Sequence, residues 1–227
     1  MSGFAVNHRC CVCADGGRVR NSKGLTELCP ACSGQSATES IEDPQERMRL
    51  PSKFRDATFA QWLPDNGSPR LRCQGYASTW PPRVPMMFLT GTKGTGKTTL
   101  ACAIARTVYE RHQVRAQFWP VIDLLDRYRR TFDQDRAVET TDDIDVQMRR
   151  VPLLVLDDYG AHKGTEWAEE RLFALIDYRY REMLPTIITS NVAAMEIAER
   201  VRSRLTDVSV CQIVQFSGKD MRPEANR

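Results

Sequence analysis

The feature that most constrains this chain is a glycine-rich loop that joins a short apolar run to an amphipathic stretch. The loop reads GTKGTGKT at residues 91–98, which fits the pattern G-x4-G-K-[ST], and it follows the apolar run 84–90. Apolar residues then recur at helical spacing, which predicts a helix over 97–112. A strand, a tight loop and a helix in this order form the context in which the pattern binds phosphate. We therefore expect an α/β fold that holds a nucleotide.

The residue types in this loop suit the binding of phosphate. The glycines allow backbone N–H groups to turn toward phosphate oxygens, and the positive end of the following helix points at the same anion. Lys97 is expected to reach the β- and γ-phosphates, and the Thr98 hydroxyl is expected to bind Mg²⁺. A chance glycine-rich turn is the alternative, but it does not account for the flanking strand and helix. We expect the nucleotide to contact Gly91, Thr92, Lys93, Gly94, Thr95, Gly96, Lys97, Thr98 and Thr99.

A second motif supplies two carboxylates. Residues 153–158 read LLVLDD, a β-prone apolar run that ends in Asp157 and Asp158. The carboxyl ends of parallel strands border the ligand crevice, so both side chains are expected beside the nucleotide. We expect Asp157 to hold Mg²⁺ through water and Asp158 to orient or deprotonate the attacking water, although Asp158 reaches less far than the glutamate often found in that role. A strand followed by an aspartate-rich turn is the alternative.

A polar residue also follows the next expected strand. A helix is expected over 165–183. The β-rich run after it covers 185–191 and ends in Asn191. From that strand tip Asn191 can hydrogen-bond the attacking water or the γ-phosphate, whereas a turn residue or a helix cap is the alternative. A further helix is expected over 193–205. It carries Arg200, Arg202 and Arg204, and a charge run of this kind is usually a solvated face.

Half of the eight cysteines form one pattern. Cys10-x-x-Cys13 is followed after fifteen residues by Cys29-x-x-Cys32, a spacing typical of a tetrahedral zinc site. Free thiols or disulfides are the alternative, but disulfides are rare in the cytosol. Cys11 offers a second, poorer register in place of Cys10. The scattered Cys73, Cys102 and Cys211 are expected to be small buried apolar residues.

Composition excludes several classes of protein. With 41% apolar and 27% charged residues the chain falls in the globular range, and it has no run of about 18 apolar residues that predicts a membrane helix. A net charge of +3 is too small to indicate a nucleic-acid partner by itself. The first residues lack the basic and apolar segments of a secretory signal, so we expect a cytoplasmic location. Prolines at positions 64, 69, 81, 82 and 85 are expected to keep long helices out of that segment.

Taken in this order, the motifs resemble those of the AAA+ ATPases of the DnaC/IstB group, which contains bacterial and phage replicative-helicase loaders and transposition helper ATPases. The resemblance implies an α/β AAA+ P-loop core, with a parallel sheet flanked by helices and no sizeable C-terminal lid, preceded by a small zinc ribbon-like domain. We accordingly expect a zinc-binding domain over 1–36, a linker over 37–50, an AAA+ ATPase domain over 51–217 and a tail over 218–227. The residues that carry the resemblance are 50–62, 91–99, 153–160, 186–191, 199–205 and 215–222.

The same resemblance implies roles for residues beyond the phosphate loop. Asn191 corresponds to the residue called sensor 1. Arg204 corresponds to the arginine finger that completes the ATP site of a neighbouring subunit, with Arg200 or Arg202 as alternates. An arginine suits this role because its fixed charge can stabilise the phosphate charge of the transition state. Arg222 is the candidate for the arginine that a lid would otherwise supply.

The region between the two phosphate motifs bears on the substrate. Residues 118–119 predict a short strand, and 121–132 predict a helix with apolar residues on one face. By resemblance to loaders and initiators, such a helical insertion lines a channel and holds single-stranded DNA. The alternative is an amphipathic helix whose arginines face solvent. The expected DNA-binding residues are Arg127, Tyr128, Arg129 and Arg130, with Phe132 as a further stacking face.

These expectations combine into one functional hypothesis. The chain is expected to load a replicative DNA helicase hexamer onto single-stranded DNA in replication initiation, as a ring or spiral of ATP-hydrolysing subunits with Mg²⁺ and Zn²⁺ as cofactors and without a membrane partner. The zinc domain would dock the helicase or contact DNA. One alternative is an IstB-like transposition helper that binds duplex DNA and activates a transposase. Another is a zinc-dependent regulatory module that uses ATP only as a switch. A metabolite kinase is disfavoured because it explains neither the cysteines nor Arg204.

Overall fold

The computed structural model describes residues 18–20, 26–28, 48–61, 68–132, 139–161, 165–192, 194–218 and 220. The chain divides into two units, Met1–Asp43 and Pro44–Arg227. In the first unit the described residues form an antiparallel pair of strands, β1 (Arg18–Arg20) and β2 (Thr26–Leu28). The residues predicted to bind zinc, Cys10, Cys13, Cys29 and Cys32, lie outside the described residues, as does Cys11.

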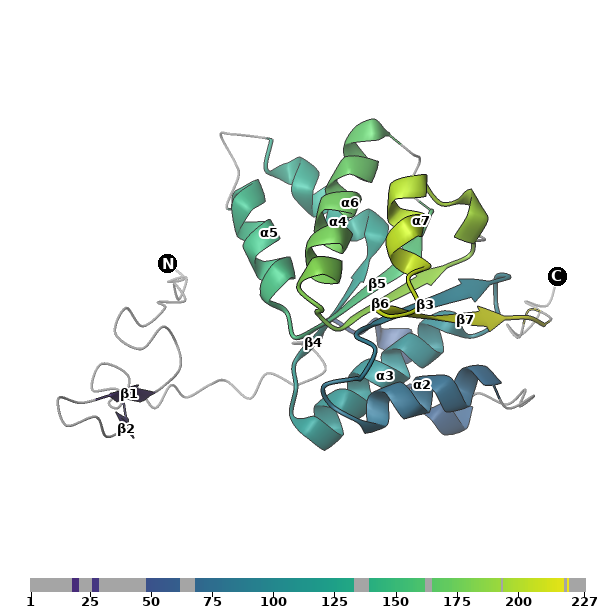
Figure 1. Cartoon of the computed structure of the whole chain (residues 1–227), viewed down its shortest axis with the longest axis horizontal. Coiled ribbons are helices and arrows are strands. Elements are labelled where there is room, and N and C mark those ends of the chain that lie inside the picture. The colour runs from purple at the N-terminus through teal and green to yellow at the C-terminus, as the bar shows by residue number, and fades with distance from the viewer. Residues whose placement is uncertain are drawn as a thin grey trace. The chain divides into compact units, whose positions relative to one another are not determined.

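The second unit is built on a five-stranded parallel sheet. Its strands lie in the order β4-β5-β6-β3-β7, so the first strand of the sheet in the sequence lies between the last two (Figure 1). Most of the strand residues are buried, as expected for a parallel sheet with both faces covered. The predicted parallel sheet flanked by helices is thereby confirmed. The strands are β3 (Met86–Gly91), β4 (Ala116–Pro120), β5 (Leu153–Tyr159), β6 (Thr186–Ser190) and β7 (Cys211–Phe216).

Helices cover both faces of the sheet (Figure 1). On one face lie α2 (Ser68–Ser78) and α3 (Lys97–His112). On the other lie α4 (Val121–Arg130), α5 (Thr141–Arg150), α6 (Glu166–Arg181) and α7 (Glu199–Leu205). No helix among the described residues is long and apolar enough to cross a membrane. Among the residues of this unit that the structure describes, three short 3-10 helices are also present, at Ser52–Phe54, Phe59–Gln61 and Ala194–Glu196.

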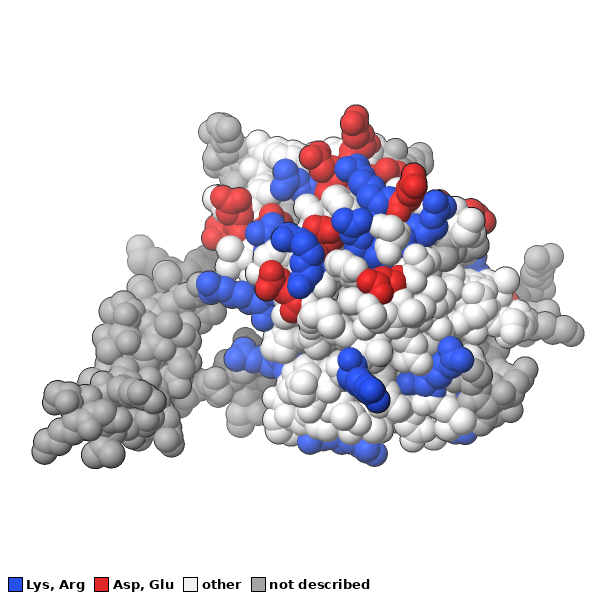
Figure 2. Space-filling model, in the orientation of Figure 1, with Lys and Arg blue, Asp and Glu red and all other residues white. Residues whose placement is uncertain are grey.

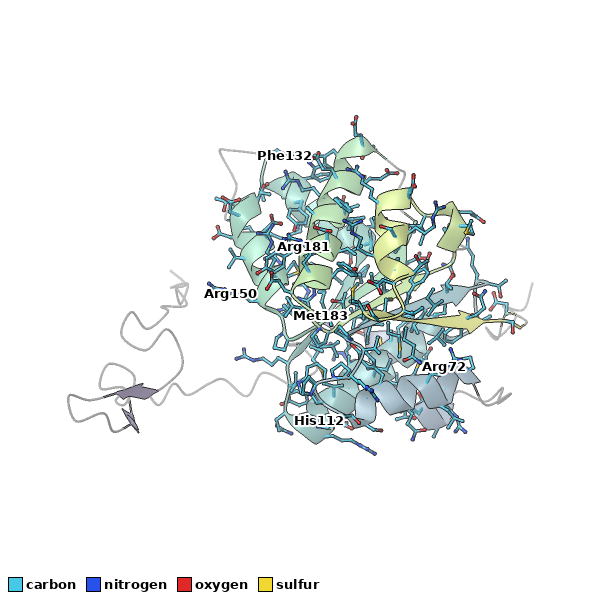
Figure 3. All side chains as sticks on the ribbon, viewed as in Figure 1. Arg72, His112, Phe132, Arg150, Arg181 and Met183 are labelled. Carbon is cyan, nitrogen blue, oxygen red and sulfur yellow. The ribbon has the colours of Figure 1, made fainter. Side chains whose placement is uncertain are left out.

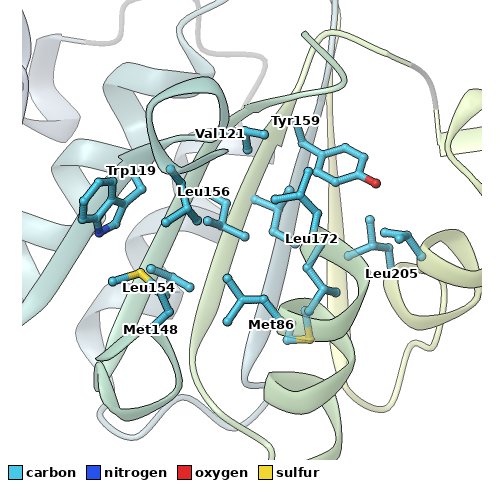
Figure 4. Packing of buried hydrophobic residues seen from close by; sticks show 14 of the residues in the cluster. Met86, Trp119, Val121, Met148, Leu154, Leu156, Tyr159, Leu172 and Leu205 are labelled. Carbon is cyan, nitrogen blue, oxygen red and sulfur yellow. The ribbon is translucent and has the colours of Figure 1, made fainter. Parts of the chain in front are cut away.

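The alternation of strand side chains produces two separate apolar cores. Met87 and Leu89 of β3 pack with α2 and α3, whereas Met86 and Phe88 pack with the helices of the other face. Figure 4 shows this second core, in which Met86 and Leu156 of the sheet lie close to Leu172 of α6. Because successive strand residues point to opposite faces, both cores follow from continuous apolar runs rather than from an alternating pattern.

Several local predictions need correction. Pro69 does not prevent α2, because it occupies the first turn, where a proline costs no hydrogen bond. The helix predicted over 193–205 begins only at Glu199, since Ala198 is extended and Ile197 before it is buried in the core. The helix α5 was not predicted, although Thr140 and Asp143 form a capping box at its start. The helix predicted over 97–112 is confirmed.

A fully buried arginine on α6 joins the elements at the amino ends of the strands. Nη1 of Arg179 donates to the carbonyl oxygens of Met148 (2.8 Å) and Val151 (3.0 Å), and Nη2 donates to that of Pro185 (2.7 Å). Nε donates to Oγ1 of Thr186 (2.8 Å). Burial lowers the pKa of the Arg179 guanidinium to about 10, so it stays charged at neutral pH. These four bonds tie α6 to the end of α5 and to the starts of β5 and β6.

Candidate functional site

The predicted site residues meet at the carboxyl ends of three adjacent strands. The loop at 91–98 follows β3, Asp157 and Asp158 end β5, and Asn191 follows β6. These strands are neighbours in the order β5-β6-β3, and the chain reverses its winding direction at β3. Crevices at such a reversal are where ligands bind in open parallel sheets. Residues that lie far apart in the sequence are therefore brought together at one edge of the sheet.

The loop has the geometry of a phosphate cradle. Gly94 and Gly96 adopt left-handed φ angles of 75° and 87°, which side chains other than glycine rarely adopt. Lys97 is buried, and its Nζ donates to the carbonyl oxygens of Gly91 (2.8 Å) and Thr92 (2.7 Å). The Lys97 side chain thus lies across the loop in which it is predicted to bind phosphate. Thr95 is buried, Thr99 is half-buried and Lys93 is exposed.

The segment that follows β7 packs against the outside of the loop. A Cβ atom on Gly91 would overlap the carbonyl oxygen of Phe216, and one on Gly94 would overlap the Asp220 carboxylate. Oγ1 of Thr92 donates to the carbonyl oxygen of Gly218 (3.3 Å). The loop glycines are therefore required by close packing as well as by backbone conformation. These contacts were not predictable from local sequence patterns, because they join residues more than a hundred positions apart.

Thr98 and Asp157 form a pair of oxygen ligands suited to Mg²⁺. Oγ1 of Thr98 donates to Oδ1 of Asp157 (2.9 Å), and Oγ1 of Thr189 donates to the same oxygen (2.6 Å). Burial raises the pKa of the Asp157 carboxyl, while the hydrogen bonds from Thr189 and Thr98 lower it. A divalent cation would favour the ionised form of such a carboxyl. The hard oxygen donors and their spacing fit Mg²⁺.

A β-bulge sets the direction of the two carboxylates. Leu156 of β5 pairs with Ile188, but the next pair along is Tyr159 with Ser190, so two residues of β5 lie opposite Thr189 alone. Asp158, inside the bulge, has a left-handed φ of 59°. The bulge departs from a regular strand, in which consecutive side chains point to opposite faces.

Thr189 and Asn191 complete the bulge from β6. The backbone N–H of Asp158 donates to Oγ1 of Thr189 (2.9 Å). Nδ2 of Asn191 donates to Oδ1 of Asp158 (2.6 Å). The two residues predicted to contact the attacking water are therefore in contact with each other. Thr189 was missed in the sequence; the signal available was a hydroxyl among apolar residues, next to the strand end predicted to reach the site.

The arginines of α7 are not joined to this cluster within the chain. Nε of Arg204 donates to Oδ1 of Asp177 on α6 (3.0 Å). The guanidinium of Arg200 lies over the ring of Phe173, and Nη1 of Arg202 donates to a backbone carbonyl oxygen. Arg222, the candidate lid arginine, lies outside the described residues.

The four predicted DNA-binding residues differ in accessibility. Tyr128 is buried and donates to Oδ1 of Asp145 (2.6 Å), so its ring offers no stacking face. Arg127 is paired with Glu139. Arg129 and Arg130 are exposed. Only the last two arginines therefore extend from α4 into solvent.

An aromatic pair lies beside these exposed arginines. Phe132 is 60% exposed, and its ring meets that of Trp167 at 5.5 Å in an edge-to-face arrangement. The Arg129 guanidinium lies 5.5 Å from the same Trp167 ring. Figure 3 shows Phe132 at the end of α4 far from the sheet. Trp167, at the start of α6, was not among the residues predicted to bind DNA.

Positive and negative charges are mixed on the surface of the helices α5 to α7. Figure 2 shows basic and acidic side chains intermingled over α5 to α7, without a broad surface of one sign. Ion pairs account for part of this mixture, including Arg129 with Asp126 and Arg149 with Asp145. Contacts with a polyanion on this face would therefore depend on particular side chains, as the small net charge of +3 indicates.

A parallel sheet of this order, with a phosphate loop after β3, acidic residues at the end of β5 and an asparagine after β6, defines the AAA+ class of P-loop ATPase fold. Within that class, the model of the family described as IstB-like ATP binding protein matches residues 76–223. The chain belongs to this family.

Individual relatives agree with this assignment. The chain is 28% identical over 142 residues to the Bacillus subtilis (strain 168) protein YqaM, covering 59% of this chain and 44% of that protein. It is 26% identical over 112 residues to the replicative helicase loader DnaI of the same strain, covering 49% of this chain and 34% of DnaI. The chain thus matches less than half the length of these relatives. The crystal structure of the DnaC helicase loader has a similar fold, with a TM-score of 0.64 and 24% identity over 74% of this chain and 100% of that one.

Proposed function

We propose that the chain is an ATP-dependent loader that places a replicative DNA helicase on single-stranded DNA during replication initiation. The observation that carries the proposal is the similarity to the replicative helicase loader DnaI, in a chain whose phosphate loop, acidic pair and asparagine meet at one edge of the sheet. ATP binding orders the contacts with the helicase and between subunits. Hydrolysis then releases the loader.

The proposed hydrolysis reaction divides its tasks among the described residues. The loop at 91–98 binds the phosphates, and Lys97 moves from its carbonyl partners to the β- and γ-phosphates. Thr98 and Asp157 would hold Mg²⁺, which would supply positive charge to the phosphate oxygens. Asp158 orients the attacking water and accepts its proton. Asn191, which already donates to Asp158, holds that carboxylate and the water in line with the γ-phosphate.

The proposed site is completed by a second copy of the chain. Arg204 of one subunit reaches the γ-phosphate held by its neighbour, where a fixed positive charge stabilises the transition state. This arrangement requires self-association into a ring or spiral. It is consistent with the position of Arg204 outside the cluster of its own chain.

Single-stranded DNA is proposed to cross the exposed end of α4. Arg129 and Arg130 contact phosphates there, while Phe132 and Trp167 offer aromatic faces to bases. Replacing both aromatic residues by alanine is expected to weaken binding of an oligothymidylate by at least about tenfold, since base stacking contributes about 1–3 kcal/mol per base. Arg150→Ala, on the exposed end of α5, serves as the control. Fluorescence anisotropy at several salt concentrations measures the difference, and equal affinities of all variants would contradict the assignment.

The N-terminal residues are proposed to form a zinc domain over 1–36 that docks the helicase. Support comes from the spacing of Cys10, Cys13, Cys29 and Cys32 and from the β1–β2 pair that separates the two cysteine pairs in the sequence. The linker is proposed over 37–50, the ATPase domain over 51–217 and a tail over 218–227. Metal analysis of Cys29→Ser protein is expected to show lost zinc, and full retention would count against the four-cysteine site.

A transposition helper is the second candidate, favoured by the family description as IstB-like. The two functions are separated by a pull-down with purified replicative helicase hexamer, using tagged wild-type chain and Lys97→Ala as a matched nucleotide-site control. A loader retains the hexamer in the presence of ATP and Mg²⁺, and Lys97→Ala retains less. A chain that does not bind the helicase but binds duplex DNA tightly is a transposition helper. Multiple-turnover ATPase assays separate both from a regulatory module that uses ATP only as a switch.

A further inference from the structure

Arg204 is held in its own chain by several side chains. Its Nε donates to Oδ1 of Asp177 (3.0 Å), and its Nη1 donates to Oγ of Ser203 (2.7 Å). The guanidinium also lies 5.3 Å from the ring centre of Phe173 and 5.9 Å from that of Tyr180. These contacts restrict a side chain that would otherwise move through many rotamers. Among the described residues, Nη2 has no hydrogen-bond partner.

Asp177 is shared between two arginines of different exposure. Oδ1 accepts from Arg204, and Oδ2 accepts from Nε of Arg181 (3.0 Å). The side chain of Asp177 is 18% exposed and that of Arg204 is 32% exposed, whereas that of Arg181 is 60% exposed. One carboxylate between two guanidiniums leaves the group with a net positive charge. It can therefore still attract a phosphate.

The other arginines of α7 are held differently. The guanidinium of Arg200 lies 5.0 Å from the ring centre of Phe173, and Nη1 of Arg202 donates to the carbonyl oxygen of Met195 (3.0 Å). Within the described part of the chain neither is paired with a carboxylate. Of the three arginines on this helix, Arg204 alone has a carboxylate partner there that fixes the plane of its guanidinium group.

We propose that Asp177 is a positioning residue for Arg204. It holds the Nε edge of the guanidinium so that the Nη2 end is ordered before the neighbouring subunit's nucleotide arrives. An arginine that is ordered in advance loses less conformational entropy when it reaches the transition state. The inference rests on the proposed function, because it assumes that Arg204 acts on the site of a neighbour.

Mixed assemblies test the proposal directly. Asp158→Asn subunits hydrolyse little ATP themselves but carry an intact Arg204, whereas Arg204→Ala subunits have an intact site but no arginine to donate. Mixing the two restores hydrolysis if Arg204 acts in trans. The test replaces the donor by the double variant Asp158→Asn, Asp177→Ala. We expect the restored rate to fall at least about tenfold, the scale on which misplaced catalytic groups act.

Arg181→Ala provides the matched control, since it removes the exposed partner of Asp177 and leaves the Arg204 contact. The double variant Asp158→Asn, Arg181→Ala is expected to restore hydrolysis as fully as Asp158→Asn alone. In a homogeneous assembly Asp177→Ala is expected to lower kcat with KM and the ATP Kd unchanged. Thermal unfolding of each variant identifies any loss of fold. An additional Asp177→Asn variant, which keeps the shape of the side chain, repeats the measurement if Asp177→Ala unfolds.

Each result decides one question. Undiminished or increased hydrolysis with the Asp177 variants overturns the positioning role, and an increase means that Asp177 withholds the arginine instead. A raised KM with unchanged kcat also overturns it. If Asp158→Asn subunits fail to restore Arg204→Ala subunits at all, Arg204 does not act in trans. The proposed shared site then fails, and the role of Asp177 fails with it.

Discussion

Two polar clusters lie at opposite ends of the same sheet and are built differently. At the amino ends of the strands, Arg179 donates to four backbone carbonyls and one hydroxyl. At the carboxyl ends, Oγ1 of Thr189 bonds to the Asp157 side chain and to the Asp158 backbone N–H. Asn191 donates to the Asp158 side chain, and Lys97 donates to backbone carbonyls of the loop. Arg179 is fully buried, whereas Asp157, Asp158 and Asn191 are half-buried and can exchange one partner for a ligand. The first cluster therefore stabilises the fold, and the second can change its bonds during a reaction.

The largest effect is expected from breaking the amino-end cluster. Arg179→Met fills similar space but leaves buried carbonyl oxygens without donors, and each buried polar group left unsatisfied costs about 1–3 kcal/mol. Chemical denaturation is expected to show that loss in the free energy of unfolding. ATP affinity of the remaining folded protein is expected to be unchanged. A variant as stable as wild type would mean that the Arg179 bonds do not stabilise the fold.

The carboxyl-end cluster is expected to show the opposite pattern. Lys97→Ala removes the charge that reaches the phosphates, and losing one such group typically lowers kcat about 10²- to 10³-fold. The free energy of unfolding without nucleotide is expected to change little. Arg111→Ala, an exposed basic residue in the last turn of α3, is the control and is expected to retain most activity. Steady-state ATPase assays measure both variants, and comparable losses would remove the special role of Lys97.

A smaller effect is expected at the contact between Asn191 and Asp158. Asn191→Ala removes the donor to Oδ1 of Asp158, so the water loses its orientation while the phosphate loop stays intact. We expect kcat to fall about 10²-fold, at the low end of the range typical of proton-transfer groups, with an unchanged Kd for ATP. Single-turnover hydrolysis and equilibrium nucleotide binding separate the two quantities. A weaker Kd with normal hydrolysis would place Asn191 in binding instead.

The smallest effect concerns stability at the carboxyl ends. Burial raises the pKa of Asp157 in the metal-free protein, so its ionised form opposes folding. Asp157→Asn is therefore expected to stabilise the metal-free protein at pH 7 while it abolishes Mg²⁺-dependent hydrolysis. Each 1 kcal/mol would raise the Tm by roughly 2–4 °C in a domain of this size.

The pH dependence gives the sign of this effect. Because the folded pKa of Asp157 lies above the unfolded one, wild type loses stability relative to Asp157→Asn as pH rises from the ordinary aspartate value of about 4 through the folded pKa. Below that window the two Tm values are expected to converge. Scanning calorimetry at pH 3.5 to 8 in the presence of a chelator tests this, and a difference that is independent of pH would exclude ionisation as the cause.

The two clusters also differed in how far the sequence could predict them. The loop, Asp157, Asp158 and Asn191 were predictable because each follows a β-prone apolar run, and parallel strands bring their ends together. Arg179 was not, because on a helix an arginine is usually solvated, and its acceptors are backbone atoms of three other segments. The burial of Tyr128 was not predictable for the same reason, since its hydroxyl donates to Asp145 of another helix. Local pattern predicts strand ends, whereas burial of a polar side chain depends on the tertiary structure.

The position of β3 in the sheet has a consequence for how the protein is made. Met86 pairs with Thr186 on one side and with Cys211 on the other, and Gly91 rests against Phe216. The loop is translated early, but the strands that support it are among the last described parts of the chain to be synthesised. Pairing across such long sequence separations forms late in folding. The contacts that support the loop are therefore complete only after β7 has left the ribosome.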